Sequence, residues 1–435
     1  MFKGQKMRKH YLTPKFFETI KSYSAAQFVK DITAGIIVAI IALPLSIALA
    51  LASGVEPSQG IYTAIAAGFF VALLGGSSVQ IAGPTAAFAT IVAGVVSKQG
   101  MDGLFIATVM AGIILILMGI LKLGNLIRFI PKTVTVGFTG GIAVTILLGQ
   151  VKDFFGITYA SGVKPIEIIE KIEANIHHFA SFKWEALVIG FIALLVLIVY
   201  PKLEKKIPPS LIAVVVGALL VGIIPLFSNN VSTIGDLYDI PKGLPKVDFG
   251  SMQFTKEKII AVIPNAFTIA LLAGVESLLS CVVADGMIND KHNSNVELVG
   301  QGVANIASVF FGGIPATGAI ARTAANIKNG GRTPIAAMVH SFVLLLILIV
   351  LMPYAKLIPM PVIAAILFIV AYNMSEWRHF VAIYKTKRID DILVLTVTFV
   401  LTVVFDLVVA IVAGMILYAI TLLIGKITKK EGVEN

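Results

Sequence analysis

The chain has 435 residues, of which 57% are hydrophobic and only 13% carry a charge. A soluble domain has about a quarter of its residues charged, so this composition excludes a soluble enzyme and indicates an integral membrane protein. The formal net charge of +10 fits basic cytoplasmic loops better than nucleic-acid binding. The single cysteine, Cys281, excludes an intramolecular disulfide and a cysteine-based metal site.

Apolar segments follow one another along almost the whole chain. The clear candidates for spanning helices are 32–52, 103–121, 133–150, 185–200, 210–226, 258–283, 296–311, 334–352, 389–405 and 407–424. Shorter or broken candidates begin at Ile61, at Pro84, in the stretch FGGIPATGAIARTAANI and at Pro361. Together they predict an all-α polytopic membrane protein of about 14 transmembrane segments, since helices satisfy their own backbone hydrogen bonds in lipid.

Clusters of basic residues test this topology. They are the N-terminal arm, Lys122–Lys132, Lys202–Lys206, Lys328–Arg332, Arg378–Arg388 and Lys426–Lys430. With about 14 spans and a cytoplasmic N-terminus, every cluster falls on the cytoplasmic side, as the positive-inside rule requires. We therefore expect a cytoplasmic arm over 1–30, a transmembrane domain over 31–426 and a short cytoplasmic tail over 427–435.

Two amphipathic stretches connect the predicted spans. They are EIIEKIEANIHH, from Glu167, and SEWRHFVAIYKTKR, from Ser375. Each is either a helix that lies along the membrane interface or an ordinary connecting helix.

The third and tenth predicted segments are both broken by glycine and proline. The third reads GGSSVQIAGPTAAFATIV and the tenth reads FGGIPATGAIARTAANI. They are seven segments apart, which is the offset expected of two seven-helix repeats with inverted topology. Interrupted segments at matching places in two repeats indicate the central site of a transporter. The alternative is that both are kinks in ordinary spanning helices.

A half-helix that begins inside the protein presents unpaired amides and a partial positive charge. Two such helix ends that meet near mid-membrane would bind an anion. Pro84 and Pro315 suit the extended stretch or first turn before each half-helix. The predicted lining residues are small or lie in the first turns: Thr85, Ala86, Ala87 and Phe88 on one side, and Thr317, Gly318, Ala319 and Ile320 on the other.

Two charged residues lie within the predicted spans near this site. Arg322 follows the start of the tenth segment by about one turn, where it would add positive potential; alternatively it extends toward the cytoplasm with its basic neighbours. Glu276 is the isolated acid of the eighth segment, and such a residue is a functional candidate by default. It could bind a proton, or bind sodium with Ser277 or Ser280, or bond to Arg322 or to a broken helix end as a structural residue.

The other titratable residues carry weaker signals. Asp285 and Asp290 are expected to be solvated loop residues, Asp406 to cap a turn, and His340 to be a hydrogen-bonded packing residue. No nucleophile–base pair or metal cluster is apparent, so we expect neither an enzyme nor a cofactor other than a coupling ion.

Three stretches resemble the SulP family of anion transporters, which includes the mammalian solute carrier 26 proteins. They are DITAGIIVAIIALPLSIALALASGVEPSQGIYTA, QIAGPTAAFATIV and ESLLSCVVADGMINDKHNSNVELVGQGVANIASVFFGGIPATGAIARTAANIKNGGRTP. The resemblance runs from about Phe28 to Lys426. It looks closest to bacterial members with Glu in segment eight, which implies proton-coupled uptake of a C4-dicarboxylate, sulfate or bicarbonate across the inner membrane.

The resemblance also implies a fold and a set of site residues. The fold is a 7+7 inverted repeat in which a core domain (about 31–122 and 257–352) moves like an elevator against a gate domain (about 133–226 and 360–425), in a homodimer. By motif, the substrate site would comprise Thr85, Ala86 and Ala87 with Ala319, Ile320, Ala321 and Arg322, and Glu276 would be the coupling acid.

The chain departs from the family pattern in two places. Many members have Gln after the proline of segment one, where this chain has Leu45, so a possible hydrogen bond to substrate is lost. Members also usually carry a cytoplasmic STAS domain after the last span, whereas this sequence ends in KITKKEGVEN, either as a short natural form or as a truncation.

Several functions remain open from the sequence. A sodium-coupled symporter or an anion exchanger would use the same anion site. A nucleobase–cation symporter shares this kind of repeat fold, but it should offer side-chain hydrogen bonds rather than Arg322. An anion channel would not need Glu276 and would not accumulate its substrate.

Overall fold

The computed structural model describes residues 12–125, 131–160, 162–163, 165, 167–204, 207–238, 254–405 and 407–431. Several features expected from the sequence lie wholly or partly outside the described residues: the start of the N-terminal arm, parts of the Lys122–Lys132 and Lys202–Lys206 clusters, Asp406, and the end of the tail. Most of what is described is helical, as predicted.

The helices follow the predicted apolar segments closely. They are α1 (Lys15–Thr19), α2 (Ala25–Ala52), α3 (Pro57–Leu74), α4 (Ala89–Ile120), α5 (Lys132–Gly149), α6 (Val151–Phe155), α7 (Ile168–His177), α8 (Trp184–Leu203), α9 (Pro209–Ile223), α10 (Pro225–Ser228), α11 (Ile234–Leu237), α12 (Lys256–Ile288), α13 (Ser294–Phe310), α14 (Ile320–Lys328), α15 (Pro334–Leu351), α16 (Met360–Met374), α17 (Trp377–Lys385), α18 (Ile389–Val404) and α19 (Leu407–Glu431). The described residues also include two short strands, β1 (Ala82–Gly83) and β2 (Thr317–Gly318).

Eight of the described helical segments are long and apolar enough to cross a membrane, and two shorter apolar helices add to them. The total of about 14 spans therefore stays a prediction. One reason for the lower number is that α4 joins two predicted spans at Gly100, where φ is 71°. Another is that α14 has only nine residues, which is too short to cross a bilayer.

Local sequence signals explain where many helices begin. Proline occupies the first helical position of α3, α9 and α15, where a missing N–H costs nothing. Helix α12 is capped by the Thr255 hydroxyl and α13 by the Asn293 side chain. Helix α12 ends at Asn289, which adopts the left-handed conformation (φ 53°).

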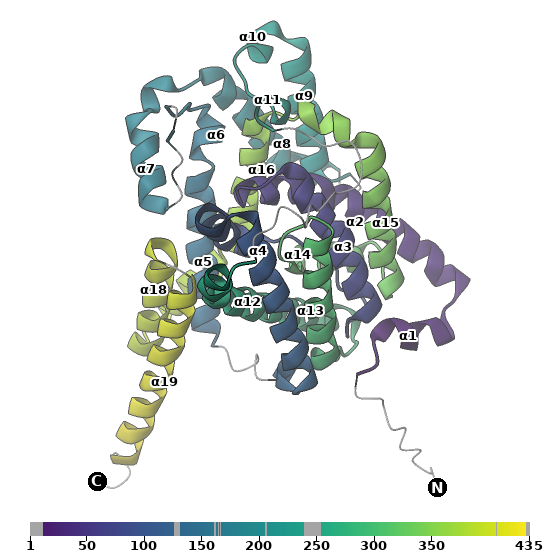
Figure 1. Ribbon diagram of the computed structural model, residues 1–435, viewed down its shortest axis with the longest axis vertical. Coiled ribbons are helices and arrows are strands. Elements are labelled where there is room, and N and C mark those ends of the chain that lie inside the picture. Colours follow the sequence, from purple (N-terminus) through teal and green to yellow (C-terminus); the bar gives the residue numbers. More distant parts are fainter. Residues whose placement is uncertain are drawn as a thin grey trace.

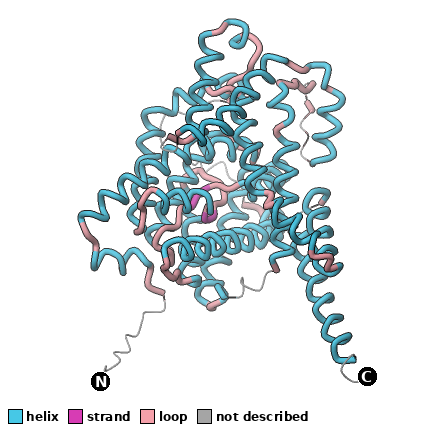
Figure 2. The backbone as a smooth tube through the Cα atoms, turned by 180° about the vertical axis from the view of Figure 1, so that it is seen from behind, coloured by secondary structure: helices cyan, strands magenta, loops and turns pink. Residues whose placement is uncertain are grey.

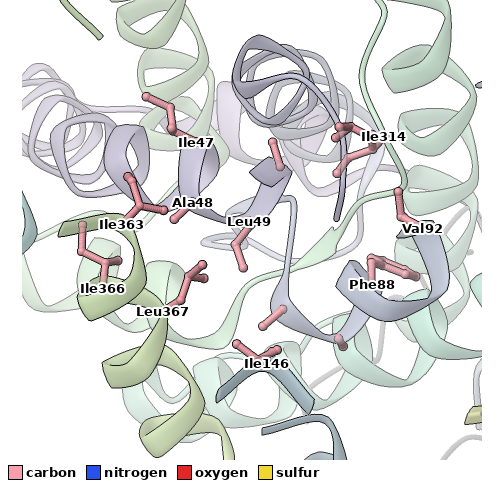
Figure 3. Close-up of a cluster of buried hydrophobic side chains, with 14 of the residues drawn as sticks. Ile47, Ala48, Leu49, Phe88, Val92, Ile146, Ile314, Ile363, Ile366 and Leu367 are labelled. Carbon is pink, nitrogen blue, oxygen red and sulfur yellow. The ribbon is translucent and has the colours of Figure 1, made fainter. Parts of the chain in front are cut away.

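The helices pack in two groups. One group joins α2, α3, α4, α12, α13, α14 and α15; the other joins α5, α8, α9, α16, α18 and α19. Helices α18 and α19 lie along one flank of the molecule, opposite α1 (Figure 1). The groups meet in an apolar seam where Leu49 of α2, Ile146 of α5 and Leu367 of α16 gather near Phe88 (Figure 3).

A buried carboxylate fixes the loop that connects α14 to α15. Asp31, fully buried in α2, accepts hydrogen bonds from the side chains of Gln27, Tyr23 and Thr333 and from the backbone amide of Arg332. These four donors compensate the cost of burying the charge. The start of α15 and the end of α14 are thereby tied to α2.

Candidate functional site

The two broken segments lie side by side in the interior of the molecule. Strand β1 pairs antiparallel with β2, with Ala82 opposite Gly318 and Gly83 opposite Thr317. The pairing continues with a hydrogen bond of 2.8 Å from the amide of Ala319 to the carbonyl of Ile81. Figure 2 shows this strand pair surrounded by helices. Extended backbone needs hydrogen-bond partners where water is absent, and each segment supplies them to the other.

The segment after β1 begins a helix at Thr85. Thr85 has extended backbone angles, and Ala86–Phe88 form a single 3-10 turn that leads into α4. The amides of Ala86 and Ala87 belong to the first turn and have no partner within the helix. Thr85 is partly exposed, whereas Ala86, Ala87 and Phe88 are buried. Phe88 packs in the apolar seam and its amide donates to the carbonyl of Thr85, so it contributes shape rather than a free donor.

The segment after β2 begins the short helix α14. Ala319 precedes the helix, and the first helical hydrogen bond runs from the amide of Thr323 to the carbonyl of Ala319 (2.9 Å). The amides of Ile320, Ala321 and Arg322 therefore have no partner within the helix. Ile320 is 42% exposed and Ala321 is also exposed. This helix end is thus open to a ligand.

Arg322 lies beside the strand pair and does not extend to the surface. Its side chain is buried, one of its nitrogens (Nη2) donates to the carbonyl of Pro84, and its Nη1 lies against Gly83. Its other two nitrogens, Nε and Nη1, have no hydrogen-bond partner among the described residues. The carbonyl of Pro84 directly precedes the first helix end, so the guanidinium places a full positive charge beside it.

Glu276 contacts the same helix end from α12. Its Oε2 accepts a hydrogen bond of 2.9 Å from the hydroxyl of Thr85, and the residue is partly exposed. Within the described part of the chain it forms no ion pair with Arg322. The sequence left two structural partners possible for Glu276, namely Arg322 and a broken helix end. The structure shows the contact with the broken helix end.

The neighbours of Glu276 on α12 hold strand β2 in place. The hydroxyl of Ser277 accepts from the amide of Gly318 (2.9 Å) and lies 2.9 Å from the hydroxyl of Thr317. Thr317 in turn donates to the carbonyl of Ala273. Since these groups bond to one another, the position of the second helix end is set by α12, the helix that carries Glu276.

Sequence reasoning missed two buried residues that anchor strand β1. The side-chain amide of Gln80 makes three hydrogen bonds. Its Nε2 donates to the carbonyl of Ser277 (3.0 Å) and to Oε1 of Glu297 (3.3 Å), and its Oε1 accepts from the hydroxyl of Ser280 (2.8 Å). Glu297, fully buried in α13, also accepts from the amide of Gly76 (2.9 Å). The signal for Glu297 was present: like Glu276, it is an acid within a predicted span.

Two acids that were expected to be solvated have partners instead. Asp285 belongs to α12, and its Oδ2 lies 2.7 Å from Nδ1 of His292. Asp290 accepts from the hydroxyl of Ser78 (2.6 Å) and pairs with Lys15 (3.4 Å). Burial tends to raise the pKa of Asp290, but these hydrogen bonds and the charge of Lys15 outweigh it, so its pKa is lowered. The prediction was wrong for Asp290 because the N-terminal segment brings Lys15 to this loop, and for Asp285 because His292 folds back against the end of α12.

The second ring nitrogen of His292 lies 3.0 Å from the hydroxyl of Ser294, which completes an Asp–His–Ser series. A Cβ atom added to Gly124 would lie 2.9 Å from the Cβ of Ser294, so the backbone that follows α4 packs closely against this serine. The series links α12 to α13 as a structural network. His340 is fully buried, and neither ring nitrogen has a partner among the described residues, so the predicted hydrogen bond is not seen.

Comparison with known proteins places this geometry in a family. Residues 28–398 match the Sulfate permease family. The putative sulfate transporter YvdB of Bacillus subtilis (strain 168) is 42% identical over 430 residues, which cover 97% of this chain and 78% of the relative. The transmembrane domain of a cyanobacterium bicarbonate transporter, BicA, superposes with a TM-score of 0.80 at 30% identity and covers 89% of this chain and 98% of that domain.

A more distant structure shows the same fold. The overall structure of SLC26A9 superposes with a TM-score of 0.83 at 19% identity over 93% of this chain and 66% of that one. The predicted class of all-α polytopic membrane protein with an inverted-repeat fold is therefore confirmed, whereas the division into seven plus seven segments stays a prediction. Taken with the paired broken segments and the match over most of the chain, these likenesses show that the chain belongs to the sulfate permease family.

Proposed function

We propose that the chain is a secondary active transporter that takes up a small anion together with a proton. The observation that carries the proposal is the meeting of three features at one place. Two helix first turns converge on the β1–β2 pair, Arg322 lies beside that pair, and Glu276 hydrogen-bonds to Thr85 at the first of the helix ends. Thr85 therefore belongs to the proposed anion site and also contacts the acid Glu276.

The anion would lie between the two helix ends. On one side it would accept hydrogen bonds from the amides of Ala86 and Ala87, and on the other from those of Ile320 and Ala321. Alanine at three of these positions keeps the side chains next to the backbone amides small. Arg322 would add long-range attraction without touching the anion. Backbone amides bind carboxylates, sulfate and bicarbonate by the same physics, so C4-dicarboxylate, sulfate and bicarbonate all fit.

The names of the relatives narrow this choice. They are a putative sulfate transporter and a bicarbonate transporter, and both match most of this chain. Sulfate and bicarbonate are therefore the first substrates to test, with fumarate or succinate next.

The Thr85–Glu276 contact provides a route for coupling. While Glu276 is a carboxylate, it can only accept, and the Thr85 hydroxyl donates to it. Once Glu276 binds a proton, its carboxyl group can donate to the oxygen of Thr85. The hydroxyl hydrogen of Thr85 is then free to bond to the anion. Proton binding would thus add one donor to the anion site and remove a negative charge from beside it.

Sodium coupling is the main alternative and is less well supported. A sodium ion needs several oxygen ligands. The hydroxyls of Ser277 and Ser280, which the sequence offers for this purpose, are engaged with Gly318 and Gln80 respectively. The described residues contain no group of three or more His, Cys, Asp or Glu side chains that could hold a metal ion.

Movement would occur at the apolar seam between the two helix groups. The group of α2–α4 and α12–α15 carries the whole candidate site and would be the core; the group of α5, α8, α9, α16, α18 and α19 would be the gate. A seam lined by apolar side chains such as Leu49 and Leu367 holds few specific bonds that must break, which suits an elevator-like displacement (Figure 3). We further propose a homodimer in the bacterial inner membrane with both termini in the cytoplasm.

The test is uptake of labelled sulfate, bicarbonate, fumarate and succinate into proteoliposomes. Each anion is supplied with an inward proton gradient, with an inward sodium gradient, and with neither. Accumulation of one of them under the proton gradient alone is the expected result. Accumulation only with sodium would reassign Glu276 to a cation site. Uptake that merely equilibrates would indicate a channel, and uptake only against a preloaded anion would indicate an exchanger.

A further inference from the structure

A cavity of about 390 Å³ lies between the two helix groups, away from the strand pair. Its walls come from α2 and from the end of α14 on one side, and from α8, the turn before α9, and α16 on the other. This volume falls in the range of about 300–1,000 Å³ that is typical of ligand pockets. The cavity spans the boundary at which the two groups would move.

The lining is apolar because each helix turns one stripe toward it. Helix α2 contributes Ile37, Ile41 and Leu45 at a spacing of four residues, and α16 contributes Ile366, Ile369 and Val370. Leu45, the residue that replaces the family's frequent Gln, therefore faces this cavity. The cavity continues into an exposed apolar surface at the end of α8 and beyond it, where Leu203 is 78% exposed and Ile207 is 43% exposed. An apolar chain could enter from the bilayer without crossing water.

Three lysines lie next to residues that line the cavity or next to the loop that follows them. Lys328 directly precedes the lining residue Asn329, and Lys202 directly follows the lining residue Pro201. Lys30 lies against Gly330, 3.6 Å from the position of an added Cβ. All three lysines are exposed, and none forms an ion pair with another described residue.

We propose that this cavity binds one acyl chain of an anionic phospholipid, whose phosphate is held by Lys30, Lys202 and Lys328. The apolar lining suits an acyl chain, and the three lysines suit a negatively charged headgroup in the cytoplasmic leaflet. Glu204, the acid among the lining residues, is outnumbered by these lysines. Because the lipid touches both helix groups, it holds them at one relative position, and its binding resists their displacement.

The test is native mass spectrometry of the purified full chain with two lipids that differ only in headgroup. We expect dioleoyl phosphatidylglycerol to bind roughly tenfold more tightly than dioleoyl phosphatidylcholine, since each surface lysine favours an anionic lipid severalfold. Ile41→Trp fills the cavity and should abolish this preferential binding. Ile36→Trp, on the lipid-facing side of the same helix, is the matched control and should leave it intact.

The triple variant Lys30→Gln, Lys202→Gln, Lys328→Gln tests the headgroup separately, and its exposed positions should not disturb folding. It should bind both lipids equally; Lys98→Gln is the control at a distant exposed lysine. Equal affinity of the unaltered chain for the two lipids would overturn the proposal. So would full phosphatidylglycerol binding by both the triple variant and Ile41→Trp. The experiment measures lipid binding and not transport. Its result therefore tests this proposal even if the proposed transport function is wrong.

Discussion

Replacement of Arg322 by methionine tests the electrostatic part of the anion site. The guanidinium donates to the carbonyl of Pro84, two residues before the first amide proposed to bind the anion. For an assumed separation of about 7 Å between this charge and the anion, an effective dielectric constant of about 20 gives about 2.4 kcal/mol per unit of anion charge. Since each 1.36 kcal/mol is a factor of ten, we expect the KM for bicarbonate to rise about fiftyfold, and that for divalent sulfate to rise considerably more.

The assay is initial uptake into vesicles of neutral lipid over a range of anion concentrations. Methionine should be tolerated, because two nitrogens of Arg322 have no partner and a buried, poorly paired charge contributes little stability. Lys328→Met, at an exposed cation on the same helix, is the control and should leave the KM unchanged. Gly83→Ala keeps the charge but displaces the guanidinium, so it should raise the KM less. A folded Arg322→Met variant whose KM stays within about twofold of the parent's would refute the reasoning.

Three further predictions follow from the geometry. Glu276→Gln should abolish accumulation driven by a proton gradient while anion exchange between equal pools persists; gradient-driven uptake at the parent's rate would contradict coupling at this residue. Tryptophan at Ala86 or Ala319 should block anion binding in a direct binding assay, whereas tryptophan at the exposed Ala160 should not; full binding by the first two would place the site elsewhere. The lowered pKa of Asp290 stabilises the fold above its ordinary pKa of about 3.9, so the Tm difference between parent and Asp290→Asn should shrink as the pH falls from about 6 to about 3, and a constant difference would count against the pairing.

The order and type of the helices could be predicted from the sequence because membrane-spanning helices are encoded locally. Each needs only a run of apolar residues of sufficient length, and prolines and polar caps mark many of the starts. The pairing of the two broken segments could also be anticipated, since glycine and proline breaks at matching places in two repeats are local signals. The strands themselves were not predicted, because two residues of extended chain carry no period that distinguishes them from a loop.

The side-chain contacts of the site could not be read from the sequence. The direction of Arg322 depends on space created by Gly83 of a distant segment. The hydrogen bond between Glu276 and Thr85 joins residues 191 positions apart. The sequence did not indicate a role for Gln80, because a single glutamine near a glycine–proline break is as common in an exposed loop as in a buried site. Such contacts are decided by tertiary packing, so a sequence restricts the candidates without choosing the partners.

The charges gathered at the site connect the choice of anion to the coupling ion. Two helix ends contribute roughly half a positive charge each, and Arg322 contributes one, which gives about +2. A deprotonated Glu276 reduces this to about +1, which matches bicarbonate, whereas sulfate requires the full +2 and hence a protonated Glu276. We therefore expect the KM for sulfate to rise more steeply with pH than the KM for bicarbonate, in uptake measured on the same vesicles. Equal slopes for the two anions would mean that Glu276 does not contribute to the charge that the anion experiences, and that the coupling proton binds elsewhere.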